Sequence, residues 1–314
     1  MSARFGVIAP VTRRFGPAIA RAQLAERLGC DSVWVPQQEN SRDALITLGA
    51  YASATSRVGL GTAVLPVHAL HPATLLQAAA TLDELSGGRF RLGLGSGHDS
   101  IVAEAWGLQP GRPLAVMREY LGIVRSGLRD GTVDHQGDRF RVRWTYSGPL
   151  PAQLPVLVAA LRPRMLELAG ELADGVIVWM ATPEYVRDTV VPAIRRGRAR
   201  GGHALEGFEI MVIFNICGTE DVDFGREMVG KMLQPALRLD TYRALLAAEG
   251  LAVEAWSGPG REVLDRIAAI GDLDLIRARI DAYRAAGCTL PVVVPCPDHP
   301  GAAGLEETLA AIGS

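Results

Sequence analysis

The feature that most constrains the fold of this chain is a regular alternation between short apolar runs and stretches with helical spacing. The runs are nearly continuous in apolar residues, as in parallel strands that are buried on both faces. Strands are predicted over residues 5–9, 32–36, 58–65, 90–95, 156–160, 175–179, 209–217 and 290–295. Strands that alternate with helices in this way predict an α/β fold, the (β/α)8 TIM barrel, with a doubly wound open sheet as the alternative.

Two long connections interrupt this rhythm. Residues 130–153, after strand four, are rich in turn residues and predict a hairpin at 135–140. Residues 218–262, after strand seven, predict a long helical excursion. Long connections are usually functional or form interfaces, so both insertions are expected to shape a substrate pocket. No internal repeat or linker divides the sequence, and we expect a single domain over residues 1–314.

Composition narrows the class of protein. Hydrophobic residues make up 48% of the chain and charged residues 21%, which provides a large core and argues against disorder. The net charge of −2 comes from interspersed acids and bases, so no nucleic-acid partner is expected. The four cysteines are scattered, and no apolar run approaches the ~20 residues of a membrane helix. Because no secretory signal precedes the first strand, we expect a cytoplasmic protein that acts on a small molecule.

Glycines crowd the end of the fourth strand, in the pattern Gly93-x-Gly95-x-Gly97. The dinucleotide fingerprint GxGxxG would need its third glycine at His98 or Ser100, so that kind of site is disfavoured. Glycines at a strand end also let the backbone approach a planar ligand closely, and this second interpretation fits the spacing better.

Polar residues follow the predicted strands at the positions where barrel enzymes carry their chemistry. His98 follows strand four, and its imidazole suits general acid–base catalysis; a hydrogen-bonded loop histidine is the alternative. Gln37 and Gln38 follow strand two and could bind the edge of a heterocycle or be solvated. His68 and His71 have the spacing of metal ligands, but no further His or Cys lies nearby, so we expect no metal site.

A basic turn at residues 161–165 follows strand five. Pro163 suits the first turn of a helix, and Arg162 and Arg164 flank it beside the free N–H groups of that helix start. This pattern is typical of a phosphate-binding turn, with a solvated basic turn as the alternative.

Taken together, these segments resemble the luciferase-like monooxygenase superfamily, and within it the coenzyme F420-dependent oxidoreductases. The resemblance rests on Gly61-Thr62-Ala63-Val64, on His71-Pro72, on residues 78–95 and on Ala173-Asp174-Gly175-Val176. It covers roughly residues 5–180 and is more specific to the superfamily than to the cofactor.

The resemblance implies a flavin-like ring at the carboxyl ends of the barrel strands, with coenzyme F420 as the cofactor and FMN as the alternative. It implies a bulge at Ala63-Val64, often with a non-proline cis peptide, that backs the ring. It also implies a homodimer through helices near strands two and three. The cofactor site would comprise Gln38, Thr62, Ala63, Val64, Ser96, Gly97, His98, Ala160, Leu161, Arg162, Arg164 and Met165, and the catalytic residues would be His98 and Gln37.

The function that the resemblance implies is hydride transfer between the deazaflavin C5 and a small organic substrate. An FMN-dependent monooxygenase and a flavin-binding protein without turnover are the alternatives on the same barrel. In the sugar-phosphate dehydrogenases of the family, an Asp-His pair stands at the positions of Gln37 and Gln38, and a glutamate stands at that of His98. A sugar phosphate substrate is therefore not expected.

Overall fold

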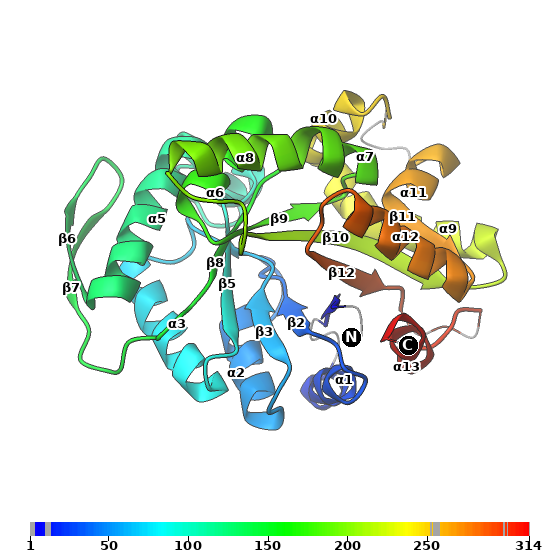
Figure 1. Cartoon of the computed structure of the whole chain (residues 1–314), viewed down its shortest axis with the longest axis horizontal. Coiled ribbons are helices and arrows are strands. Elements are labelled where there is room, and N and C mark those ends of the chain that lie inside the picture. Colours follow the sequence, from blue (N-terminus) through cyan, green and yellow to red (C-terminus); the bar gives the residue numbers. More distant parts are fainter. Residues whose placement is uncertain are drawn as a thin grey trace.

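The computed structural model describes residues 4–9, 14–251, 253, 258–297, 299 and 301–313. Within this part of the chain, parallel strands close into a barrel, and helices cover its outside (Figure 1). In order around the barrel, the strands are β1 (Gly6–Ile8), β2 (Ser32–Val35), β3 (Gly59–Thr62), β5 (Phe90–Gly95), β8 (Val156–Ala159), β9 (Gly175–Trp179), β10 (Glu209–Gly218) and β12 (Leu290–Pro295). Because β12 pairs with β1 and β9 pairs with β10, the ring is complete, and the TIM-barrel prediction is confirmed.

The helices alternate with the strands and bury their apolar faces against them. They are α1 (Phe15–Arg27), α2 (Ala44–Ala54), α3 (Pro72–Ser86), α4 (Asp99–Glu104), α5 (Pro113–Asp130), α6 (Pro163–Leu172), α7 (Pro183–Tyr185), the π-helical turn η1 (Val186–Val190), α8 (Val191–Arg200), α12 (Leu273–Ala285) and α13 (Leu305–Gly313). Inside the barrel, Trp34 packs with side chains such as Leu157 and Met211, so the interior is a packed core.

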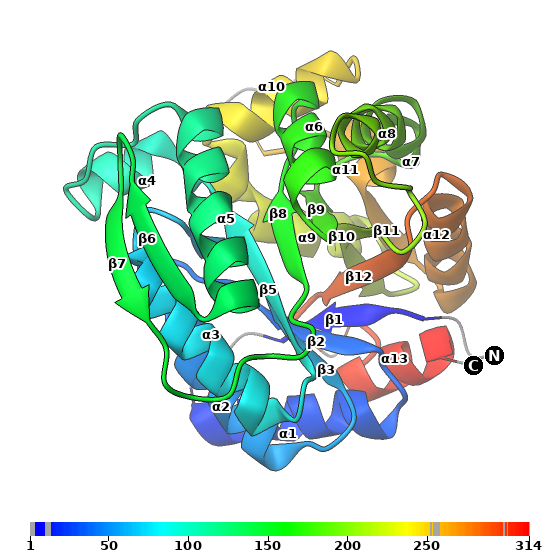
Figure 2. The same cartoon turned by 60° about the vertical axis from the view of Figure 1, so that its left-hand side comes forward.

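Residues 130–153 contain the predicted hairpin, formed by β6 (Thr132–Gln136) and β7 (Arg141–Thr145). The hairpin lies outside α5 and comes after that helix, so it is not part of the connection from a strand to its helix (Figures 1 and 2). Its tip is fixed by the Glu119 carboxylate of α5, which accepts hydrogen bonds from the backbone N–H groups of Arg139 (3.2 Å) and Phe140 (2.7 Å). The Arg139 guanidinium also donates to the carbonyl of Gln109 (2.5 Å).

Residues 218–262 contain the predicted helical excursion, with α9 (Val222–Leu237), α10 (Asp240–Ala248) and the start of α11 (Arg261–Ile267). Residues 252 and 254–257 of this prediction lie outside the described residues. The excursion leads into β11 (Ala268–Gly271), a strand that the sequence patterns do not predict because four small and apolar residues carry no period. Among the described residues, this strand pairs only with the end of β10, at Asn215–Gly218, beyond the β9 ladder.

Glu26 of α1 fixes the turn that leads into β3. Its carboxylate accepts hydrogen bonds from the backbone N–H groups of Ser56 (2.9 Å), Arg57 (2.6 Å) and Val58 (2.9 Å). Burial of this carboxylate raises its pKa, but the three hydrogen bonds outweigh burial and lower the pKa to about 2. The ionised Glu26 side chain therefore holds the start of β3, the strand that ends immediately before the Ala63-Val64 peptide bond.

Candidate active site at the carboxyl ends of the strands

The backbone between β3 and β4 (Leu65–Pro66) has a cis peptide bond at Ala63-Val64, as the family resemblance implies. Residues 58–65, predicted as a single strand, are therefore two strands separated by this bond. Ala63 and Val64 are half-buried and pack against the apolar cluster inside the barrel. A Cβ atom on Gly95 would lie 2.6 Å from Val64 Cγ2, so a residue without a side chain is needed beneath the bulge.

Thr62 holds β3 against β5 immediately before the cis peptide. Its hydroxyl donates to the Gly93 carbonyl (2.8 Å) and accepts from the Gly93 N–H (2.8 Å). The side chain is fully buried, so both hydrogen-bonding functions of the hydroxyl serve the barrel wall. This arrangement gives Thr62 a part in positioning Ala63-Val64.

Ser96, Gly97 and His98 follow β5 and are half-buried at the same end of the barrel. Gly97 has φ of +71°, a left-handed conformation that favours glycine. Burial lowers the pKa of His98 below its ordinary value of 6.5, while the carboxylates of Asp99 and Glu39 act in the opposite direction. His98 is therefore a neutral imidazole near pH 7, a form that can accept a proton.

The glutamines after β2 have different surroundings. The Gln37 side-chain oxygen accepts a hydrogen bond from the N–H of Ala44 (2.8 Å), the first residue of α2. Asp43 caps the same helix by accepting from the N–H of Ile46 (2.9 Å). The amide nitrogen of Gln37 makes no hydrogen bond within the described residues, so it is the part of this side chain that is free to bind a ligand. Gln38 is exposed.

The basic turn after β8 leads into α6. Ala160 is buried, Leu161 and Met165 are half-buried, and Arg162 and Arg164 are exposed. No carboxylate among the described residues pairs with either arginine, and Arg162 is the residue that precedes the first helical turn. Arg164 lines a groove on the outside of the barrel together with Leu114 and Arg118 of α5, among others. Because Arg164 faces away from the strand ends, Arg162 is the better candidate to bind a phosphate there.

These features place a bulge with a cis peptide, a neutral histidine and an arginine without a carboxylate partner in the described part of the chain on the carboxyl ends of neighbouring strands. Residues 3–290 match the family model of the luciferase-like monooxygenases. The chain belongs to this family. This luciferase-like chain has no helix, in the part that the structure describes, with the length and apolar character needed to cross a bilayer. The described residues also contain no group of three His, Cys, Asp or Glu side chains arranged for a metal ion.

Its relatives include F420-dependent enzymes. The luciferase-like chain is 31% identical over 310 residues to a Mycobacterium tuberculosis protein described as a coenzyme F420-dependent oxidoreductase, covering 86% of this chain and 88% of the relative. It is 28% identical over 287 residues to the 5,10-methylenetetrahydromethanopterin reductase of Archaeoglobus fulgidus, covering 85% and 86% of the two chains. An F420-dependent secondary alcohol dehydrogenase, solved in complex with an F420-acetone adduct, has the same fold: the TM-score is 0.84 at 20% identity, over 100% of this chain and 98% of that one.

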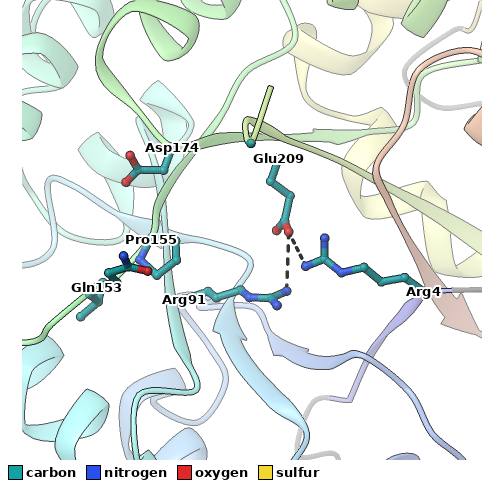
Figure 3. A pocket seen from close by; sticks show the side chains of 8 residues that line it. Arg4, Arg91, Gln153, Pro155, Asp174 and Glu209 are labelled. Carbon is teal, nitrogen blue, oxygen red and sulfur yellow. Dashed lines mark hydrogen bonds and ion pairs between the residues drawn. The ribbon is translucent and has the colours of Figure 1, made fainter. Parts of the chain in front are cut away.

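A cavity of about 510 Å³ lies at the opposite end of this luciferase-like barrel from the candidate site (Figure 3). Figure 3 shows Glu209 between the guanidinium groups of Arg4 (2.6 Å) and Arg91 (3.7 Å). Both arginines also pair with Asp31, at 2.5 Å and 2.9 Å. The arginines are thus already paired, and charges at the amino ends of barrel strands generally stabilise the fold, so we assign these groups to closing the barrel.

The structure adds one residue to the site that the motifs do not indicate. Tyr242 of α10 lies against His98 and Trp179, with ring centroids 5.4 Å and 5.1 Å away. The sequence predicts that the 218–262 excursion shapes the pocket, but periodicity does not tell which of its side chains reaches the strand ends. Tyr242 is the aromatic residue of α10, and that is the signal the sequence offers.

Proposed function

We propose that this protein is an oxidoreductase that binds coenzyme F420 at the carboxyl ends of its barrel strands and acts on a small organic substrate. The observation that carries the proposal is the half-buried apolar surface of Ala63 and Val64 after β3, which lies at the same end of the barrel as the neutral imidazole of His98. The named relatives, which include F420-dependent enzymes, support the same assignment.

The residues present fit a planar, largely uncharged ring. Ala63 and Val64 offer an apolar surface, and Gly95 and Gly97 keep the neighbouring strand end free of side chains. Arg162 would hold a phosphate of the cofactor, because its guanidinium has no carboxylate partner among the described residues and it directly precedes the first turn of α6. When bound, the deazaflavin would supply hydride transfer at its C5 atom.

The protein itself would orient the substrate and move the accompanying proton. The neutral His98 accepts a proton from the substrate when the substrate is oxidised and returns it in the reverse direction. The free amide nitrogen of Gln37 donates a hydrogen bond to the ring or the substrate, while its oxygen stays on Ala44. The walls formed by α10 and the rim loops limit access of water to the reacting atoms.

The proposal predicts that the protein binds F420 at micromolar concentration and binds FMN much more weakly. A titration followed by cofactor absorbance measures both affinities. The Arg162→Ala variant should weaken F420 binding by about tenfold, the effect of losing one charged hydrogen bond to a phosphate. Arg143→Ala, on the exposed outer strand of the hairpin, is the matched control. Binding of FMN in preference to F420 would favour the monooxygenase alternative.

We also propose that the protein is a homodimer through α2 and α3. Ile46 of α2 is 73% exposed and Leu85 of α3 is 52% exposed, and the Leu85 side chain lies beside Gly49 of α2. Adjacent exposed apolar side chains of this size fit a self-complementary contact with a second copy. Light scattering should give twice the mass of one chain, and Ile46→Glu should give a monomer. Leu275→Glu, at an exposed leucine of α12, should leave the dimer intact.

A further inference from the structure

Tyr242 joins the helical excursion to the carboxyl ends of the strands. Its ring lies at 79° to the ring of Trp179, the last residue of β9, and is tilted by 56° from the ring of His98, which follows β5. In Figure 2, α4 and α10 lie at the end of the barrel toward which β5 and β8 point. Tyr242 is thus a side chain of the excursion that contacts both the predicted catalytic histidine and an aromatic residue of the barrel.

The position of α10 is fixed by hydrogen bonds to the rim. Glu249, which follows the last residue of α10, accepts a hydrogen bond from the Thr182 hydroxyl. The same hydroxyl accepts from the N–H of Tyr185 (3.1 Å), and the Tyr185 hydroxyl donates to the carbonyl of Leu161 (2.7 Å). The helix that carries Tyr242 is therefore connected to the loop after β9 and to the basic turn before α6.

Two hydrogen-bond donors border this position without acceptors. The Trp179 indole N–H is buried and has no partner among the described residues. Burial raises the pKa of Tyr242, so its hydroxyl stays protonated, and that hydroxyl makes no hydrogen bond within the described part of the chain. Buried donors are normally paired, so the Trp179 N–H favours a ligand that brings an acceptor atom, such as a carbonyl or hydroxyl oxygen, and the Tyr242 hydroxyl is available to the same kind of atom.

Trp179 also marks which surface the ligand would contact. It packs against the apolar cluster inside the barrel together with Ala63 and Val64, the residues of the cis peptide. A ring that rests on Ala63 and Val64 would therefore share this cluster with Trp179, on which the Tyr242 ring packs. A substrate for the reaction must lie beside that ring.

We propose that Tyr242 is a specificity-determining residue: its ring closes the substrate side of the site over His98 and Trp179. It admits small molecules and donates a hydrogen bond to an oxygen of the substrate. This inference rests on the proposed function, because it takes F420 as the ring beneath the substrate. It assigns to residues 218–262 one side chain, that of Tyr242, which limits the size of the substrate that can bind.

The test uses the F420-bound protein and two ketones of different size, cyclopentanone and benzophenone. Neither ketone can be oxidised by F420, so changes in the visible band of the cofactor report binding next to the ring. In the unmodified protein, cyclopentanone should perturb the band and benzophenone should not. In Tyr242→Ala, benzophenone should bind at least tenfold more tightly than in the unmodified protein. Tyr146→Ala, at a tyrosine of the outer hairpin that stacks on Trp144, is the matched control.

The Tyr242→Phe variant separates the ring from the hydroxyl. It should keep the size limit and bind cyclopentanone about fivefold more weakly, as expected for the loss of one neutral hydrogen bond. It also keeps the packing of the phenyl ring, so it remains informative if the alanine variant does not fold.

The outcomes distinguish the two proposals. An equal response to benzophenone in the unmodified protein and Tyr242→Ala, including no response in either, would overturn the size limit. Equal affinity for cyclopentanone in the unmodified protein and Tyr242→Phe would overturn the hydrogen bond. Failure of the unmodified protein to bind F420 would instead count against the proposed function.

Discussion

Replacing His98 with alanine should lower the turnover of F420 by ~100-fold or more and leave the affinity for F420 nearly unchanged. The reason is that His98 lies at the strand ends as a neutral imidazole, which fits it to exchange the proton that accompanies the hydride. Because burial lowers its pKa below 6.5, the substrate-oxidation rate should fall only as the pH drops through that lowered value. Stopped-flow absorbance of the cofactor measures the turnover, and a binding titration measures the affinity.

His135 provides the control for this variant. It lies on β6, outside α5, and is within hydrogen-bonding distance of Glu119 (3.1 Å). His135→Ala removes the same side chain at a position remote from the strand ends, so turnover and its pH dependence should stay as they are in the unmodified protein. Equal turnover in His98→Ala and the unmodified protein would rule out the proton-transfer role.

Adding one methyl group at Gly93 should strongly destabilise the barrel. A Cβ atom there would lie 2.0 Å from the Thr62 carbonyl oxygen and 2.8 Å from the Ile177 side chain. The nearest atom is backbone, so it can move only if β3 separates from β5, and the Thr62–Gly93 hydrogen bonds would be lost with it. We expect Gly93→Ala to lower the free energy of unfolding by about 4 kcal/mol or more, or to give no soluble protein.

Gly122→Ala is the control for this effect. Gly122 lies on the exposed side of α5, and a Cβ atom there would meet no other atom within 4 Å. Because alanine is the better helix former, this variant should melt at an equal or higher temperature than the unmodified protein. A Gly93→Ala protein with unchanged melting temperature and unchanged F420 binding would contradict the close packing of β3 on β5.

The barrel is predictable from this sequence because each of its strands leaves a local signal. The eight strands are apolar runs that end near glycines or polar residues, and Gly137-Asp138 marks the turn of the hairpin between two β-forming runs. The cis peptide at Ala63-Val64 is different: its position follows from the family resemblance, since neither residue type signals it. The strand β11 leaves no signal at all, because its pairing depends on where β10 ends.

The parts of the site that the sequence does not predict depend on contacts between distant segments. Gln37 is recognisable as a polar residue after a strand, but only the fold shows that its oxygen is bound to the N–H of Ala44. Arg162 and Arg164 look equivalent in the basic turn, and the helical geometry places Arg164 on the outer groove. Tyr242 reaches His98 because α9 and α10 fold back over the strand ends. The hydrophobic periodicity of a helix predicts which of its faces is buried, but not which distant segment that face contacts.

The length of β10 has a consequence for how this barrel could be altered. Its residues 209–213 pair with β9 and residues 211–216 pair with β12, while residues 215–218 extend past β9 to pair with β11. The segment between β10 and β11 therefore starts and ends at the short β10–β11 ladder, which lies beyond the closed ring of strands. We therefore expect that a homologous loop grafted between Thr219 and Ile267 would leave the register of every barrel ladder unchanged.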